Sequence, residues 1–163
     1  MLFGKKRVER RALYAPCRGK AVPTSEIPDE VFSKGMLGVG FGMEPDEGHF
    51  CAPIGGCVES IAESKHAYTL VSDEGLDVLI HIGVDTVQMH GEGFVPRVKK
   101  GQYVKVGDVI ADADLELIRQ KGFPTVVAVL ITNPEKIENT EYRYGSVAGG
   151  RDAVMDFALT RKG

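Results

Sequence analysis

The 163-residue sequence contains no tryptophan, and aromatic residues make up only 7% of it. Its net charge of −3 leaves no basic footprint, so nucleic acid is not an expected partner. No apolar run approaches the ~18 residues of a membrane span, and the first residues lack the apolar core of a signal peptide. Three cysteines, an odd number, argue against a disulfide framework. We therefore expect a protein of the reducing cytoplasm.

Glycine and proline, with 20 and 8 residues, interrupt short runs rich in valine, isoleucine and leucine. This pattern is typical of an all-β fold, and we expect an antiparallel β-sandwich or barrel-sandwich hybrid. At this length a single domain can bury a sizeable core. Strands are predicted at 67–71, 76–82, 103–111 and 125–132, and short helical turns at 114–121, capped by Asp114, and at 134–139.

Two internal echoes indicate a duplicated β motif. Residues 15–19 (APCRG) recur as residues 52–56 (APIGG), and residues 98–102 (VKKGQ) recur as residues 104–108 (VKVGD). Each segment is typical of a strand that enters a tight glycine turn.

Residues 1–14 are predicted to form a short basic tail in front of a domain that spans residues 15–163. A basic segment with an apolar tip can lie weakly on a membrane surface, but a frayed terminus is the interpretation we favour. The cations of the tail are Lys5, Lys6, Arg7, Arg10 and Arg11.

Two of the four histidines occur in β-rich segments. His81 lies in LIHIGVDTV (79–87), an apolar strand that runs directly into a glycine, and His66 lies fifteen residues upstream. Neutral imidazole is a nucleophile and proton carrier near pH 7, so such a pair suits reversible phosphoryl transfer. His49 and His90 stand in polar turns, and we expect both to be solvated loop residues.

Whether the two imidazoles meet depends on the hairpin turn SDEG at 72–75. A two-residue loop at 73–74 places His66 directly opposite His81, with the Cβ atoms roughly 4.5–5.5 Å apart. A two-residue loop at 74–75 makes the two residues diagonal neighbours on one face. A three-residue loop sends them to opposite faces, so the residues alone leave the register open.

Several motifs follow one another in a recognisable order. The most specific are HIGVDTV at 81–87 and GEGF at 91–94, and the others are APCRG at 15–19, IPDEVF at 27–32, APIGG at 52–56, SKHA at 64–67 and VKVGD at 104–108. Together they resemble the landmarks of the glucose-class enzyme IIA family of the bacterial sugar phosphotransferase system. The resemblance covers the chain from about residue 15 to its end.

The resemblance implies a phosphotransferase component that works through a phosphohistidine, with His81 as the acceptor. It implies that the Gly83 carbonyl fixes the His81 tautomer, that His66 donates to phosphoryl oxygens, and that Ser64 orients His66. Both rings are then expected on the same face of the hairpin. The expected donor is the phosphohistidine protein HPr. The expected acceptor is a cysteine in the IIB domain of a glucose-type permease, and the protein is expected to be a monomer.

The resemblance also implies a docking surface that donor and acceptor use in turn. Asp29 and Asp85 match family positions that face arginines on the donor; without the family, each would be interpreted as a capping or turn residue. Tyr68 and Leu79 are expected to flank the histidines on the hairpin. The apolar residues expected around the pair are Phe32, Met36, Leu37, Tyr68, Leu79 and Val87.

The main alternative from another class is a swinging-arm carrier. ESKHA at 63–67 resembles the hairpin that presents a lipoyl- or biotinyl-lysine, with Lys65 as the modified residue, but such domains have about half this length. A zinc hydrolase is less favoured, because a catalytic zinc usually has three protein ligands and His66 and His81 supply two. We expect no cofactor or resident metal, and at most adventitious zinc at this pair.

Overall fold

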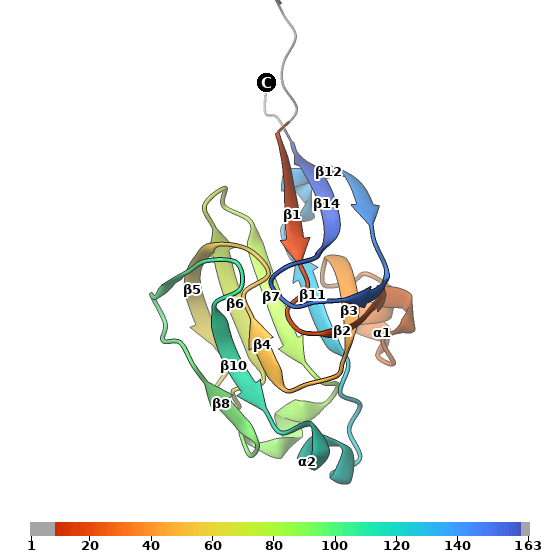
Figure 1. Ribbon diagram of the computed structural model, residues 1–163, viewed down its shortest axis with the longest axis vertical. Helices are drawn as coiled ribbons and strands as arrows, with labels where there is room; N and C mark the ends of the chain where they lie inside the picture. Colours follow the sequence, from red (N-terminus) through yellow and green to blue (C-terminus); the bar gives the residue numbers. More distant parts are fainter. Residues whose placement is uncertain (1–8, 161–163) are drawn as a thin grey trace, which may run out of the picture.

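The computed structural model describes residues 9–160, which form three antiparallel sheets (Figure 1). The large sheet has the strand order β13 (Gly145–Val147), β2 (Gly19–Pro23), β3 (Val39–Pro45), β11 (Val127–Ile131), β7 (Asp77–Ile82), β6 (Ala67–Ser72), β5 (Gly56–Ile61) and β9 (Tyr103–Val104). The second sheet contains β4 (His49–Cys51), β10 (Val109–Ala113) and β8 (Phe94–Pro96). The third contains β1 (Arg10–Tyr14), β14 (Ala153–Leu159) and β12 (Ile137–Tyr142).

The helical segments are short. They are α1 (Glu30–Ser33), α2 (Leu115–Gln120) and the 3-10 turns η1 (Thr24–Glu26), η2 (Thr86–Met89) and η3 (Pro134–Lys136). As predicted, Asp114 caps α2, because its carboxylate accepts a hydrogen bond from Leu117 N at 3.0 Å. Among residues 9–160, no helix has the length and apolar character that a bilayer span needs. The prediction of an antiparallel all-β fold is confirmed.

Side chains from all three sheets build one main hydrophobic core. In Figure 1 the β4–β10–β8 sheet lies in front of β5, β6 and β7, and β1, β12 and β14 gather at one end of the molecule. Phe41 and Ile80 of the large sheet, Phe50 and Ile110 of the second and Phe157 of the third are all fully buried in this core.

Strand β7 lies between β6 and β11, and its residues alternate between two environments. Ile80 and Ile82 point into the main core, whereas Leu79 and His81 lie half-buried on the opposite face. A second, smaller apolar cluster covers that face, and it includes Phe32 of α1. The alternation of the strand therefore places His81 beside this smaller cluster rather than in the core.

The two AP…G echoes lie side by side, and each leads into a strand. Tyr14 N, immediately before the first, donates to Pro53 O of the second at 2.9 Å. Gly19 and Gly56 are the first residues of β2 and β5, and a Cβ on either would lie 2.2 Å from a carbonyl oxygen of the neighbouring strand. The echo thus corresponds to two strand starts whose close approach only glycine permits.

Two predicted elements have other bounds in the structure. The strand predicted at 103–111 is divided by a turn at Gly107, whose φ is +90°. Its first part, β9, pairs at the edge of the large sheet, while its second part, β10, belongs to the second sheet. The helical turn predicted at 134–139 stops at Lys136, because Ile137 already pairs in β12.

The first strand lies inside the segment that was predicted to be a tail. β1 pairs with β14, and its Leu13 is fully buried. Arg11 anchors the strand, because its guanidinium Nε donates to a carboxylate oxygen of Glu74 at 2.6 Å. Residues 10–14 therefore form a paired strand rather than part of a frayed tail, with Arg10 exposed, Arg11 half-buried and Leu13 buried. Residues 1–8, on which the predicted membrane contact depends, lie outside the described residues.

Candidate functional site

His81 lies on the large sheet between small cross-strand neighbours. Its cross-strand partners are Ala67 on β6 and Ala128 on β11, which leave the imidazole uncrowded. The Phe32 ring approaches from α1, with the ring centroids 5.0 Å apart and the planes tilted by 58°. One side of the imidazole is therefore packed, and the ring remains half-buried.

A backbone carbonyl fixes the tautomer of His81. Its Nδ1 lies 2.8 Å from Gly83 O, so Nδ1–H donates to the carbonyl and Nε2 keeps its lone pair. Gly83 has φ +80°, and a Cβ there would lie 2.4 Å from Thr86 Cγ2. Thr86, fully buried, braces the same turn by donating to Ile82 O at 2.5 Å. The glycine predicted as the tautomer lock is the residue that contacts Nδ1.

The second imidazole meets the first edge-on. The His66 and His81 ring centroids are 4.8 Å apart with an interplanar angle of 86°. His66 is only 6% exposed, and its ring also contacts Phe94 of β8 at a centroid distance of 6.5 Å. Its carbonyl accepts a hydrogen bond from Ile82 N at 2.8 Å, which ties the segment to β7.

The hairpin has a three-residue loop, the case for which strand alternation alone would place His66 and His81 on opposite faces of the sheet. Ala67, not His66, is opposite His81, and Ser72 N donates to Leu76 O across a three-residue loop. The rings nevertheless meet, because His66 precedes the first residue of β6 and directly follows Lys65, whose φ is +62°. At that bend the alternation of the strand no longer dictates where the side chain points.

Both imidazoles are neutral near pH 7. Burial, and next the neighbouring His66, lower the pKa of His81 to about 4, while the Gly83 carbonyl and the carboxylates of Asp29 and Asp85 oppose this shift. Burial also lowers the pKa of His66, against the opposing influence of the Ser64 backbone. His81 therefore presents an unprotonated Nε2, which is the form that can act as a nucleophile.

The Ser64 backbone, rather than its hydroxyl, is the group that influences His66. The Ser64 backbone lies near enough to raise the pKa of the His66 imidazole. Within residues 9–160, however, no hydrogen bond of ordinary geometry reaches His66 Nδ1. Ser64 itself is half-buried beside the pair. An orienting role for its hydroxyl stays a prediction.

Asp29 supports the site through the short helix α1. Its carboxylate accepts hydrogen bonds from Val31 N at 2.8 Å and Phe32 N at 3.3 Å and so caps the helix that carries Phe32 to His81. Asp85 is exposed at the start of η2 with φ +62°. Both carboxylates lie near enough to raise the pKa of His81, which places them at the site.

The apolar residues expected around the histidines do not all lie on the surface. Met36, Val87 and Leu37 are 70%, 51% and 40% exposed, and Leu79 is half-buried. Phe32 is buried at 6% but contacts His81 directly.

The predicted position of Tyr68 is wrong. Tyr68 is opposite Ile80, and its side chain is only 1% exposed in the main core. The three-residue loop shifts the register by one position, which turns Tyr68 away from the face that carries His81.

Three further residues contribute to the site and were not predicted from the sequence. Val31, 41% exposed on α1, extends the apolar surface; Phe94 packs against His66; and buried Thr86 braces the Gly83 turn. Phe94 and Thr86 belong to the GEGF and HIGVDTV motifs, and this membership was the only sequence signal that could have marked them as site residues.

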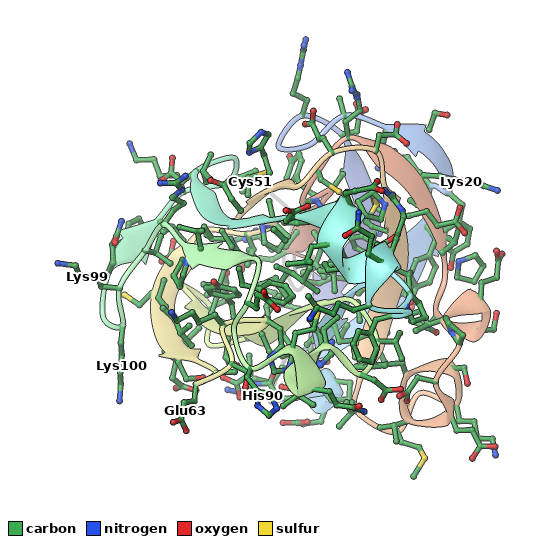
Figure 2. The ribbon with its side chains drawn as sticks, turned by 90° about the horizontal axis from the view of Figure 1, so that it is seen from below. Lys20, Cys51, Glu63, His90, Lys99 and Lys100 are labelled. Carbon is green, nitrogen blue, oxygen red and sulfur yellow. The ribbon has the colours of Figure 1, made fainter. Side chains whose placement is uncertain are left out.

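The other two histidines are not part of the ring pair. His49 Nδ1 lies 2.7 Å from an Asp112 carboxylate oxygen, and this contact raises the pKa of the exposed imidazole. His90 ends η2 with φ +52° and is exposed; Figure 2 shows it near Glu63 at one edge of the molecule. Among residues 9–160 no group of three His, Cys, Asp or Glu side chains is arranged to hold a metal ion.

Two neutral imidazoles in edge contact, one with a fixed tautomer and a free nitrogen, define a histidine group-carrier site on a β-sandwich. Comparison with known families agrees. Residues 11–137 match the family of the phosphoenolpyruvate-dependent sugar phosphotransferase system, EIIA 1, and the chain belongs to this family. It is a phosphoryl carrier and phosphotransferase component of a sugar phosphotransferase system.

Individual relatives show the same likeness over nearly the whole chain. The chain is 40% identical over 161 residues to the PTS system glucose-specific EIIA component of Staphylococcus aureus strains Mu50 and N315, with 97% of each chain covered. The solved structure of glucose permease IIA from Mycoplasma capricolum matches with a TM-score of 0.83 and 31% identity, covering 96% of this chain and 99% of that chain. The swinging-arm alternative at Lys65 is not favoured by these matches.

Proposed function

We propose that His81 accepts a phosphoryl group on Nε2 from phospho-HPr and passes it to a cysteine in the IIB domain of a glucose-type permease. The observation that carries this proposal is the hydrogen bond from His81 Nδ1 to Gly83 O, which leaves Nε2 as the unprotonated nitrogen. The names of the relatives, glucose-specific EIIA component and glucose permease IIA, support glucose as the sugar.

In the proposed transfer, the Nε2 lone pair attacks phosphorus and the bond between phosphorus and the donor nitrogen breaks. The electron pair of that bond returns to the donor imidazole. As the new P–N bond forms, the His81 ring gains positive character. The Gly83 carbonyl, Asp29 and Asp85, the groups that oppose the lowering of the His81 pKa, then stabilise that charge.

His66 is the second participant in this proposal. The two rings meet edge to face at a centroid distance of 4.8 Å, so an N–H of His66 can donate to a phosphoryl oxygen on His81. Because burial lowers its pKa, His66 acts as a neutral donor rather than as a cation. Phosphoryl transfer depends mainly on such positioning and charge stabilisation.

The docking surface in this proposal consists of Val31, Met36, Leu37 and Val87, with Leu79 at its edge. The four named first are exposed, and they lie on α1, on the segment after it and on η2, the elements that adjoin His81. Interfaces bury apolar cores of this kind, and water must leave the site during transfer. HPr and the IIB domain use the surface in turn, and the carrier works as a monomer.

The proposal places this chemistry in the cytoplasm and without a resident metal. Cys17, Cys51 and Cys57 are all free thiols, as a reducing compartment requires. A zinc ion at His66 and His81 would need further ligands from solvent or a partner, because catalytic and structural zinc sites use three or four protein ligands.

The test is incubation with phosphoenolpyruvate, enzyme I and HPr, followed by measurement of the intact mass. The wild-type protein should gain one acid-labile, base-stable phosphoryl group, and His81→Ala should gain none. His90→Ala, which changes an exposed histidine outside the pair, serves as the matched control and should label fully. Labelling that persists in His81→Ala would refute the assignment of the acceptor.

A further inference from the structure

Left-handed backbone is concentrated around the histidine pair. Four residues other than glycine have positive φ in the described part of the chain, and three of them adjoin the site: Lys65 (62°), Asp85 (62°) and His90 (52°). Asparagine, aspartate and histidine adopt this conformation more readily than most residues, so Lys65 is the outlier among the four. Such outliers commonly mark functional positions.

Lys65 lies at the rim of the site. It immediately precedes His66 in the turn that joins β5 to β6, where its N–H donates to Ala62 O at 2.8 Å. Its Cδ and Cε lie 3.6 and 3.9 Å from the position of a Cβ on Gly91, so the stem lies beside the turn that leads to Phe94. Phe94 in turn packs against the His66 ring.

The site otherwise offers a phosphoryl dianion little positive charge. Both imidazoles are neutral, and the charged groups that influence His81 are the carboxylates of Asp29 and Asp85. A phosphoryl group carries nearly two negative charges at pH 7, so these carboxylates would repel it.

Lysines on the neighbouring segments are already paired. Lys34 pairs with Glu30 and Lys121 with Glu92, whereas exposed Lys65 forms no ion pair within residues 9–160. Figure 2 shows the side chains of Glu63 and His90 at the same edge of the molecule.

We propose that the Lys65 ammonium stabilises the phosphorylated form of the protein by charge, from the rim beside His66. The inference rests on the proposed function. It assigns to Lys65 the counter-charge that the histidine pair lacks, and it explains why a lysine occupies a position where asparagine or glycine would be less strained.

The experiment measures the equilibrium constant for phosphoryl exchange between phospho-HPr and this protein, by quantifying both phosphoproteins at low salt. Lys65→Asn removes the charge and suits the left-handed backbone, so the fold is retained. It should lower the equilibrium constant about two- to fivefold, the effect of one exposed charge pair. Lys65→Arg should restore it, and the difference should vanish near 1 M salt, where charges are screened.

Lys20→Gln is the matched control, because Lys20 is exposed on the side of the molecule away from His90 and Glu63 (Figure 2). It should leave the equilibrium constant unchanged. The role of Lys65 would be overturned if Lys65→Asn had the wild-type equilibrium constant or if Lys20→Gln lowered that constant equally. It would also be overturned if the decrease in Lys65→Asn persisted in 1 M salt. If wild-type protein accepts no phosphoryl group, the proposed function itself fails.

Discussion

His81 should make the stability of the protein depend on pH in a defined window. Its pKa is about 4 in the folded protein, against about 6.5 for an ordinary histidine. As the pH falls below 6.5, the unfolded chain binds a proton at this residue while the folded protein does not. Stability is therefore fully present above pH 6.5 and is lost progressively as the pH falls toward 4.

The size of the effect follows from the difference between the two pKa values. Each pKa unit corresponds to about 1.4 kcal/mol, so the full pKa difference would lower the free energy of unfolding by about 3 kcal/mol between pH 6.5 and 4. Because His81 is half-buried, solvent reduces this to about 2–3 kcal/mol. Other histidines also titrate in this window, with His66 adding to the loss and His49, whose pKa is raised, opposing it.

A matched variant separates His81 from these other groups. Urea unfolding of the wild-type protein and of His81→Gln, measured at intervals from pH 7.5 to 4.5, gives the free energy of unfolding of each. The wild-type protein should lose more stability on acidification than the variant, and the gap in slope should close above pH 6.5. Parallel stability curves across the window would refute the inferred burial and neutrality of His81.

Two further results are expected at the site. His66→Ala should still accept phosphate on His81, but about a hundred- to a thousandfold more slowly, because loss of one well-placed transition-state donor costs ~2.7–4 kcal/mol; rapid-quench transfer in both directions measures this, and wild-type rates would make His66 a bystander. Val87→Glu should slow phosphorylation by HPr without unfolding, since Val87 is 51% exposed beside the site, while Val95→Glu, at a comparably exposed valine on β8, should not. Equal transfer rates in these two variants would contradict the docking surface.

The residues alone determined the parts of this protein that depend on local chemistry. Short glycine-punctuated runs indicated an all-β fold, and the repeated AP…G segments marked two strand starts that approach their neighbours closely. Asp114 capped its helix as predicted. The contact between His81 and Gly83 also spans only two residues, so a motif can encode it.

Only the tertiary structure decided how distant segments meet. The three-residue loop at 73–75 would have separated the histidines by strand alternation alone, yet the bend at Lys65 brings His66 back to His81. The same register turned Tyr68 into the core. Register depends on the packing of whole sheets, and a one-residue shift reverses every side chain, so no local pattern could settle it.

The same reason explains the remaining differences. The sequence of β9 and β10 resembles that of one continuous strand, but the two strands belong to different sheets. Gly107 allows the chain to turn between them. Arg10–Tyr14 carries the charges of a tail, but pairing with β14 and burial of Leu13 make it a strand. In each case the partner lies far away in sequence. Hydrogen-bonding partners and buried area from those distant segments, rather than local propensity, determine the outcome.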